Sequence, residues 1–125
     1  MISTAAAPPR TPLKIDDATC RLFQSAVELA GRKWNAAIML ALARGAARFT
    51  EITALVAGIS DRVLAARLRE LETQELIVRQ VAQTMPVQVH YQLTPRGHEL
   101  IALLQPLVGW GARWNVASSD NRQDS

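Results

Sequence analysis

The sequence has few of the residues that metal, disulfide or acid–base chemistry needs. It contains one cysteine, Cys20, and two histidines, His90 and His98, among 125 residues. A single cysteine closes no internal disulfide, and cysteine and histidine nowhere have the spacing of a zinc site. Neither histidine has an acid or a thiol nearby in a pattern typical of a catalytic set. We therefore expect no enzyme activity, no metal and no cofactor.

Long apolar runs are also missing from the chain. No stretch reaches the roughly 18 apolar residues that a membrane span requires. The first dozen residues lack the charged start and apolar run of a secretory signal. We therefore expect a cytoplasmic protein without a membrane partner, and a lone thiol fits that reducing compartment. The length fits one domain, and 49% hydrophobic with 20% charged residues is ordinary for a globular protein.

The charge is modest in size but unusual in kind. The net charge is +3, and the basic residues are twelve arginines against two lysines. The planar guanidinium group suits phosphate oxygens and guanine edges, so this composition is compatible with nucleic-acid binding. High-GC coding also favours arginine over lysine, so composition leaves both interpretations open.

The ends differ from the middle of the chain. Residues 1–15 include three prolines among small residues, which predicts a flexible arm. Residues 118–125 are wholly polar, which predicts a frayed tail. The folded body is therefore expected over residues 16–117.

Apolar spacing within this body predicts four successive helices. Leu22–Gly31 has the three- and four-residue spacing of an amphipathic helix, and Trp34–Leu42 is apolar on nearly every face, as in a central helix. A short helix from Thr50 ends at Gly58, and Ser60 is a suitable N-cap for the next one. Two helices joined by so tight a turn form a helix-turn-helix. The inner face of the second helix is predicted to consist of Leu64, Leu68 and Leu71.

The period changes after Leu76 from helical to alternating. Ile77–Val81 and Val87–Leu93 are predicted strands of a hairpin, with Pro86 in the turn. Thr94 and the proline after it start a last helix, which later proline and glycine residues kink or divide. The order of elements predicts a mainly α fold with a small β-hairpin wing (α+β), a winged helix-turn-helix that dimerises through its terminal helices.

A DNA-reading face follows from the helical geometry. With the three leucines turned inward, Arg62, Ala66 and Arg69 point outward, and the small residue lets the helix enter the major groove. The alternative is that Arg62, Arg67 and Arg69 are solvated charges, some paired with Glu70 and Glu72. Further phosphate candidates are Arg32, Lys33, Arg44 and Arg48.

The last helix has more large apolar side chains than a small core can bury. Pairing it and the first helix across a two-fold axis would bury the excess and separate two recognition helices by roughly 34–36 Å, one DNA turn. Alternatively, the last helix packs across its own domain. The predicted dimer interface consists of Leu22, Phe23, Leu103, Leu107, Trp110 and Trp114.

Between Cys20 and Trp114 the chain resembles the HxlR family of winged helix-turn-helix regulators, which are MarR-like. The resemblance implies a homodimeric, cytoplasmic, double-stranded-DNA-binding repressor or activator that responds to oxidants, electrophiles or small molecules. The segments that carry it are GRKW (31–34), RFTEI (48–52), GIS (58–60), VLAARLRELE (63–72), LIVR (76–79), MPVQVHYQLTPRG (85–97) and Trp110.

By position, the resemblance begins the recognition helix at Ser60 and places the wing near Pro86. Two residues depart from the family pattern: Glu75 occupies a position that is usually glycine, and Gln88 one that is often arginine. The residues predicted to bind DNA are Arg48, Ser60, Arg62, Val63, Ala66, Arg67, Arg69 and Gln88.

Many members carry a cysteine near the start of the first helix that senses oxidants or quinones, and Cys20 lies at about that position. A helix N-terminus and the adjacent Arg21 both favour reactive thiolate. Yet lone cysteines are commonly buried small apolar residues, and the separation from GRKW is one residue longer than in redox sensors. Trp34 is a candidate for lining a ligand pocket or for the core.

Two other functions fit the same sequence less well. One is a winged-helix protein-interaction module without DNA binding. The other is a small-molecule-binding protein or enzyme with a pocket at the dimer interface, but the polar residues it would need are not found.

Overall fold

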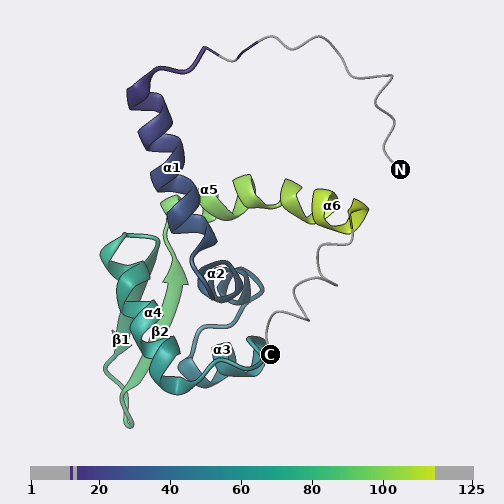
Figure 1. The fold of residues 1–125 in the computed structure, drawn as a ribbon. Helices are drawn as coiled ribbons and strands as arrows, with labels where there is room; N and C mark the ends of the chain where they lie inside the picture. The colour runs from purple at the N-terminus through teal and green to yellow at the C-terminus, as the bar shows by residue number, and fades with distance from the viewer. Residues whose placement is uncertain (1–11, 13, 115–125) are drawn as a thin grey trace.

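The computed structural model describes residue 12 and residues 14–114, which form six helices and one antiparallel pair of strands (Figure 1). Most of the predicted N-terminal arm, and all of residues 115–125 with the predicted tail, lie outside the described residues. The elements are α1 (Asp17–Gly31), α2 (Asn35–Ala43), α3 (Phe49–Leu55), α4 (Asp61–Thr73), β1 (Ile77–Ala82), β2 (Gln88–Leu93), α5 (Pro95–Leu104) and α6 (Pro106–Arg113). The predicted fold class, a winged helix-turn-helix with a small hairpin, is confirmed.

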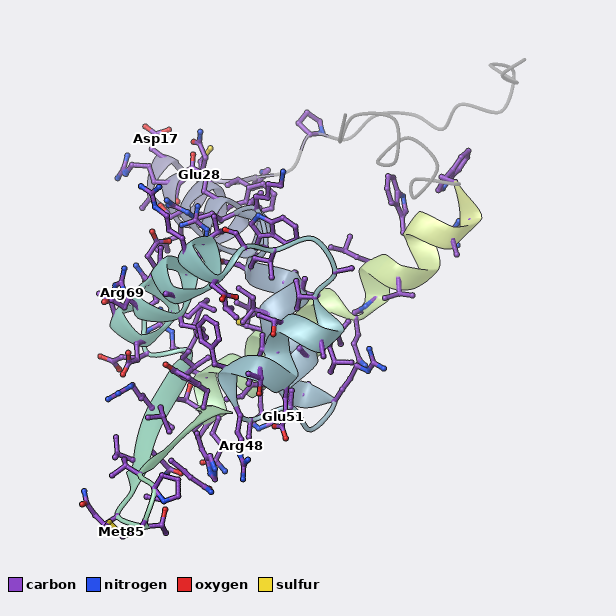
Figure 2. The ribbon with its side chains drawn as sticks, turned by 90° about the horizontal axis from the view of Figure 1, so that it is seen from below. Asp17, Glu28, Arg48, Glu51, Arg69 and Met85 are labelled. Carbon is purple, nitrogen blue, oxygen red and sulfur yellow. The ribbon has the colours of Figure 1, made fainter. Side chains whose placement is uncertain are left out.

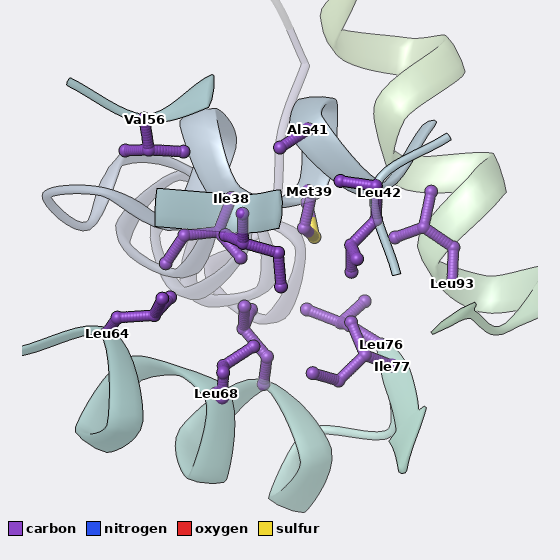
Figure 3. Close-up of a cluster of buried hydrophobic side chains, with 13 residues drawn as sticks. Ile38, Met39, Ala41, Leu42, Val56, Leu64, Leu68, Leu76, Ile77 and Leu93 are labelled. Carbon is purple, nitrogen blue, oxygen red and sulfur yellow. The ribbon is translucent and has the colours of Figure 1, made fainter. Parts of the chain in front are cut away.

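Helix α2 lies at the centre of the core, as its all-round apolar sequence predicted. Ile38 and Met39 are completely buried, and α2 contacts α1, α3, α5 and β2. Figure 3 shows side chains of α4 and of the start of β1 meeting those of α2 in this cluster. Leu64, Leu68 and Leu71 are all buried there, so the predicted inner face of α4 is confirmed.

Local signals explain where the helix-turn-helix bends. Gly58 lies between α3 and α4 with φ +89°, a left-handed conformation that costs glycine little. Ser60 then caps α4, because its hydroxyl accepts a 3.1 Å hydrogen bond from the Val63 backbone N–H. Together these two residues end one helix and start the next.

The hairpin pairs β1 with β2 in a register that runs from Ile77 opposite Leu93 to Ala82 opposite Gln88. The Tyr91 backbone N–H donates to the Ala47 carbonyl at 2.7 Å, which joins the outer edge of β2 to the segment before α3. The turn before β1 has φ +60° at Glu75. A glutamate thus holds a left-handed conformation that glycine would adopt at lower cost.

The last helical region is divided, as its prolines and glycines predicted. α5 ends at Leu104 and α6 begins at Pro106, with Gln105 between them. Thr94 caps α5 by accepting from the Gly97 N–H at 3.0 Å, and its hydroxyl donates to the Glu75 carbonyl at 2.7 Å. None of the described helices combines the length and the apolarity needed to cross a membrane.

Candidate nucleic-acid interface

The start of α4 and the tip of the hairpin lie at the same end of the molecule. In Figure 1 both point downward, while α1 and the end of α4 lie at the opposite end. Met85 at the hairpin tip is 98% exposed, and Ser60 and Arg62 at the start of α4 are exposed as well. This end therefore presents a capped helix start beside a projecting hairpin, the arrangement with which winged helices enter adjacent DNA grooves.

The predicted DNA contacts on α4 do not share one environment. Val63 and Ala66 are half-buried on the flank of the helix, whereas Arg62 is exposed. The side chain of Arg67 is only 21% exposed and its Nη1 donates to Glu70 Oε2 at 3.0 Å. The ion pairing that the sequence left open as an alternative therefore exists for Arg67.

Glu70 also holds a residue from outside the helix-turn-helix. Arg32, in the turn between α1 and α2, places its Nε 3.2 Å from Glu70 Oε1. Arg67 therefore belongs to a three-residue ionic group that faces the α1–α2 turn. Arg69 is exposed and lies with Ala66 in a groove between α4 and α1.

Arg48 and Gln88 are 40 residues apart in sequence but meet at the turn end of the hairpin, where Gln88 pairs with Ala82. Arg48 Nη2 donates to Gln88 Oε1 at 3.2 Å, which links the start of α3 to β2. Figure 2 shows Arg48 beside Glu51, above the hairpin that ends at Met85. The structure thus joins one predicted phosphate contact to the predicted wing residue.

Glu51 is a residue of this site that we did not predict. Its Oε1 accepts from the backbone N–H groups of Ala47 and Arg48, at 2.9 Å each. These two hydrogen bonds stabilise the carboxylate and lower the pKa of Glu51 below its ordinary value. The signal was a glutamate three residues after a helix start, the N3 position of a capping box. Glu51 therefore fixes the backbone that carries the Arg48 side chain.

The remaining basic candidates and Trp34 lie near the α1–α2 turn or at the end of α2. Lys33 Nζ lies 5.4 Å from the centre of the Trp34 ring, a cation–π arrangement, and Arg44 is the exposed C-cap of α2. Trp34 is half-buried and packs against the core cluster. Its ring is therefore part of the packing around the core, and the ring atom Cη2 lies near Gly58 in the turn between α3 and α4.

The six residues predicted for the dimer interface are all exposed in the single chain, from 51% for Trp110 to 72% for Leu22. α1 and α6 extend away from the core in Figure 1. An apolar groove of about 470 Å³ lies between α1, α2, α5 and α6. Contiguous apolar surface of this kind marks an interaction site. Its lining includes Val27, Leu40, Ile101, Leu104, Leu107 and Val108.

The residues with possible redox or acid–base chemistry lie apart from one another. Cys20 is exposed near the start of α1. His90 is half-buried in β2, and His98 is exposed on α5. Among residue 12 and residues 14–114, no three His, Cys, Asp or Glu side chains are grouped so that they could hold a metal ion.

Comparison with known proteins agrees with this geometry. The sequence profile described as HxlR-like helix-turn-helix matches residues 29–119. The HTH-type transcriptional regulator YodB of Bacillus subtilis is 43% identical over 91 residues, 73% of this chain and 81% of that protein. Its quinone-bound crystal structure matches with a TM-score of 0.65 at 39% identity, over 75% of this chain and 98% of that one.

Two further solved structures share the fold. A transcriptional regulator of the MarR family from Enterococcus faecalis V583 matches with a TM-score of 0.70 at 31% identity, over 89% of this chain and 99% of that one. The redox regulator HypR in its oxidized form matches with a TM-score of 0.67 at 28% identity, over 74% and 95% of the two chains.

Proposed function

Because the chain belongs to the HxlR-like helix-turn-helix family of DNA-binding transcriptional regulators, we propose that it binds a palindromic operator as a homodimer. The observation that carries this proposal is the shared orientation of the α4 start and the wing tip. A helix enters the major groove while the hairpin follows the flanking backbone or minor groove. One helix-turn-helix and one wing in each subunit of a homodimer would fit the two halves of a two-fold symmetric DNA site.

Each predicted DNA residue has a role in this proposal that follows from its position. Ser60 holds the start of α4, and Arg62 beside it contacts base edges or phosphate. Val63 keeps its flank of the helix small enough to enter the major groove, whereas Ala66 lies with Arg69 on the side of α4 that faces α1. Arg48 and Gln88 contact the DNA backbone from the turn end of the hairpin.

Arg67 and Arg69 act differently in the proposal, because they lie on the side of α4 that faces the α1–α2 turn and α1. Arg67 positions α4 through Glu70 rather than reaching freely into a groove. The side chain of Arg69 is exposed and unpaired among the described residues, so it remains available to an anion.

The dimer in the proposal forms through α1 and α6, which both carry large apolar side chains that are exposed in the single chain. A second copy would cover the apolar groove between α1, α2, α5 and α6, which Leu107 lines, and the exposed Trp110 of the same helix. The two copies of α4 would then lie about 34–36 Å apart, which matches successive major grooves on one face of DNA.

The decisive experiment compares Arg62→Ala with Arg96→Ala on an operator selected from random duplex DNA by the wild-type protein. Arg96 is exposed on α5, which starts at the end of β2 opposite the wing tip. Arg62→Ala should weaken binding by about 1–3 kcal/mol if it contacts a base, or reduce the salt slope by about one if it contacts phosphate. Arg96→Ala should do neither.

Salt dependence separates this function from its main alternative. If several arginines displace counterions, the logarithm of affinity falls steeply as the logarithm of salt concentration rises. A protein-interaction module without DNA binding would select no operator and would show no such slope. Intact folding of Arg62→Ala with unchanged DNA affinity would likewise contradict the proposal.

Regulation by oxidants or electrophiles is a further part of the proposal. YodB is known in diamide-treated and quinone-bound forms and HypR in an oxidized form, and the exposed Cys20 of this chain is accessible to such reagents. Wild-type protein treated with a quinone should change its operator affinity, and Cys20→Ser should not respond. An equal response of the two proteins would remove Cys20 from the mechanism.

A further inference from the structure

A polar groove of about 510 Å³ lies between α1 and the C-terminal half of α4. Ser25 and Glu28 line it from α1, and Arg69 and Thr73 line it from α4. Figure 2 shows Glu28 and Arg69 on the same side of the molecule, away from Met85 at the wing tip. The volume is within the range of small-molecule sites, and the groove lies outside the proposed DNA-facing end.

The two walls carry charges of opposite sign that form no ion pair within the described part of the chain. Glu28 on α1 and Arg69 on α4 make no ion pair among these residues. The other charged residues of the groove, Arg32 and Glu70, are already paired with each other. The groove therefore offers one available carboxylate and one available guanidinium group, on opposite sides.

The residue between the walls is a buried amide with unused hydrogen-bonding capacity. Asn35 is only 2% exposed and lines the groove. Its Nδ2 donates to the Leu29 carbonyl at 3.2 Å, but its Oδ1 has no hydrogen-bond partner among the described residues. Buried amide oxygens normally have a donor, and because this oxygen has almost no accessible surface, a ligand N–H group would reach it only after the Asn35 side chain turns toward the groove.

We propose that this groove binds a free α-amino acid, whose carboxylate pairs with Arg69 and whose ammonium group pairs with Glu28. A zwitterion pairs with both available charges, whereas a simple carboxylate would leave Glu28 without a cationic partner and a simple amine would leave Arg69 without an anionic one. The ammonium group would also supply an N–H donor to Asn35 Oδ1 once that side chain turns toward the groove.

Binding at this groove would connect the ligand to the operator, an inference that rests on the proposed function. The ligand would bridge α1, which belongs to the proposed dimer interface, and α4, which reads DNA. A bridge that favours one angle between these helices changes the separation of the two recognition helices. The amino acid and the operator would then alter each other's affinity by the same factor.

The test measures binding of the standard L-α-amino acids to the full-length protein, first by thermal shift and then by calorimetry. The wild-type protein should bind at least one of them and should bind propionate and propylamine much more weakly. Arg69→Gln and Glu28→Gln should each weaken that binding at least about tenfold. Arg21→Gln on α1 and Glu99→Gln on α5 make the same changes of charge outside the groove and should leave binding unaltered.

Three results would overturn the inference: no binding by any amino acid, binding that Arg69→Gln and Glu28→Gln leave unchanged, or equal binding of propionate. Both substituted residues are exposed, so the variants should keep the wild-type fold, and circular dichroism checks that they do. Operator affinity, measured with and without the bound amino acid, should differ by at least about fivefold. Operator binding without any amino acid binding overturns only this inference, whereas amino acid binding without operator binding overturns only the proposed function.

Discussion

Gly97 is the position where adding one methyl group should disturb the packing between wing and α5. It lies in the first turn of α5 and is buried, and a Cβ there would overlap the Leu76 carbonyl oxygen and lie 3.1 Å from Leu93 Cδ2. The Leu76 carbonyl also accepts from the Thr94 N–H at 3.0 Å. The overlap cannot be relieved by rotating a side chain, because the obstacle is backbone. The helix start must therefore move away from the start of β1.

The cost of Gly97→Ala can be worked out from these contacts. Overpacking costs about 1–3 kcal/mol, and weakening the Thr94 hydrogen bond adds about 0.5–1.5 kcal/mol. The better helix propensity of alanine returns about 0.5–1 kcal/mol, which leaves a net loss of about 2 kcal/mol. With a urea m-value of about 1–3 kcal/mol per molar, the unfolding midpoint should fall by about 1 M.

Gly109→Ala is the matched control, because it makes the same substitution where an added Cβ meets nothing within 4 Å. Gly109 lies within α6, so its replacement should stabilise the protein by about 0.5–1 kcal/mol. Urea unfolding followed by circular dichroism measures both variants at equal protein concentration. A Gly97→Ala midpoint equal to or above that of wild type would refute the reasoning from the Leu76 contact.

Three further predictions concern Glu51 beneath the wing, Glu75 in the turn before β1, and the dimer. Because the pKa of Glu51 is lowered in the folded protein, its carboxylate stabilises the fold at pH values above its ordinary pKa of 4.5, and this stabilisation is lost as the pH falls through the folded pKa. Wild type should therefore lose more stability on acidification than Glu51→Gln, as measured by urea unfolding at several pH values. Glu75→Gly should raise the urea midpoint by the equivalent of about 0.5 kcal/mol, because relief of the left-handed strain exceeds the entropy gained by the unfolded chain; a lower midpoint contradicts this. Leu107→Glu should shift the protein from dimer to monomer in sedimentation equilibrium, and an unchanged dimer would exclude this face.

Much of the fold was predictable because the informative signals are local. The hydroxyl groups of Ser60 and Thr94 each cap a helix by accepting from the backbone N–H three residues later. The alternation of apolar and polar residues in Val87–Leu93 indicates a strand even when its partner strand is not known. The inward leucines of α4 follow from helical spacing alone. These features depend on neighbours within about one or two turns, so the sequence contains them directly.

The charged residues were harder to assign, because a sequence does not show which opposite charges meet. Arg62 and Arg67 look alike on a helical projection, yet Arg67 is held by Glu70 and through it joined to Arg32, 35 positions earlier. Arg48 and Gln88 meet only because the hairpin folds back beside α3. Distances of that kind arise from the packing of elements around α2.

By itself, the sequence determined the order of helices and strands, the buried face of α4 and the family, because periodicity, capping and motif spacing are properties of contiguous residues. Only the tertiary structure decided which arginines remain accessible, how Glu51 and Gln88 support Arg48, and that α1 and α4 enclose a polar groove above Asn35. Those features join residues distant in the chain, and their geometry exists only once the core has packed.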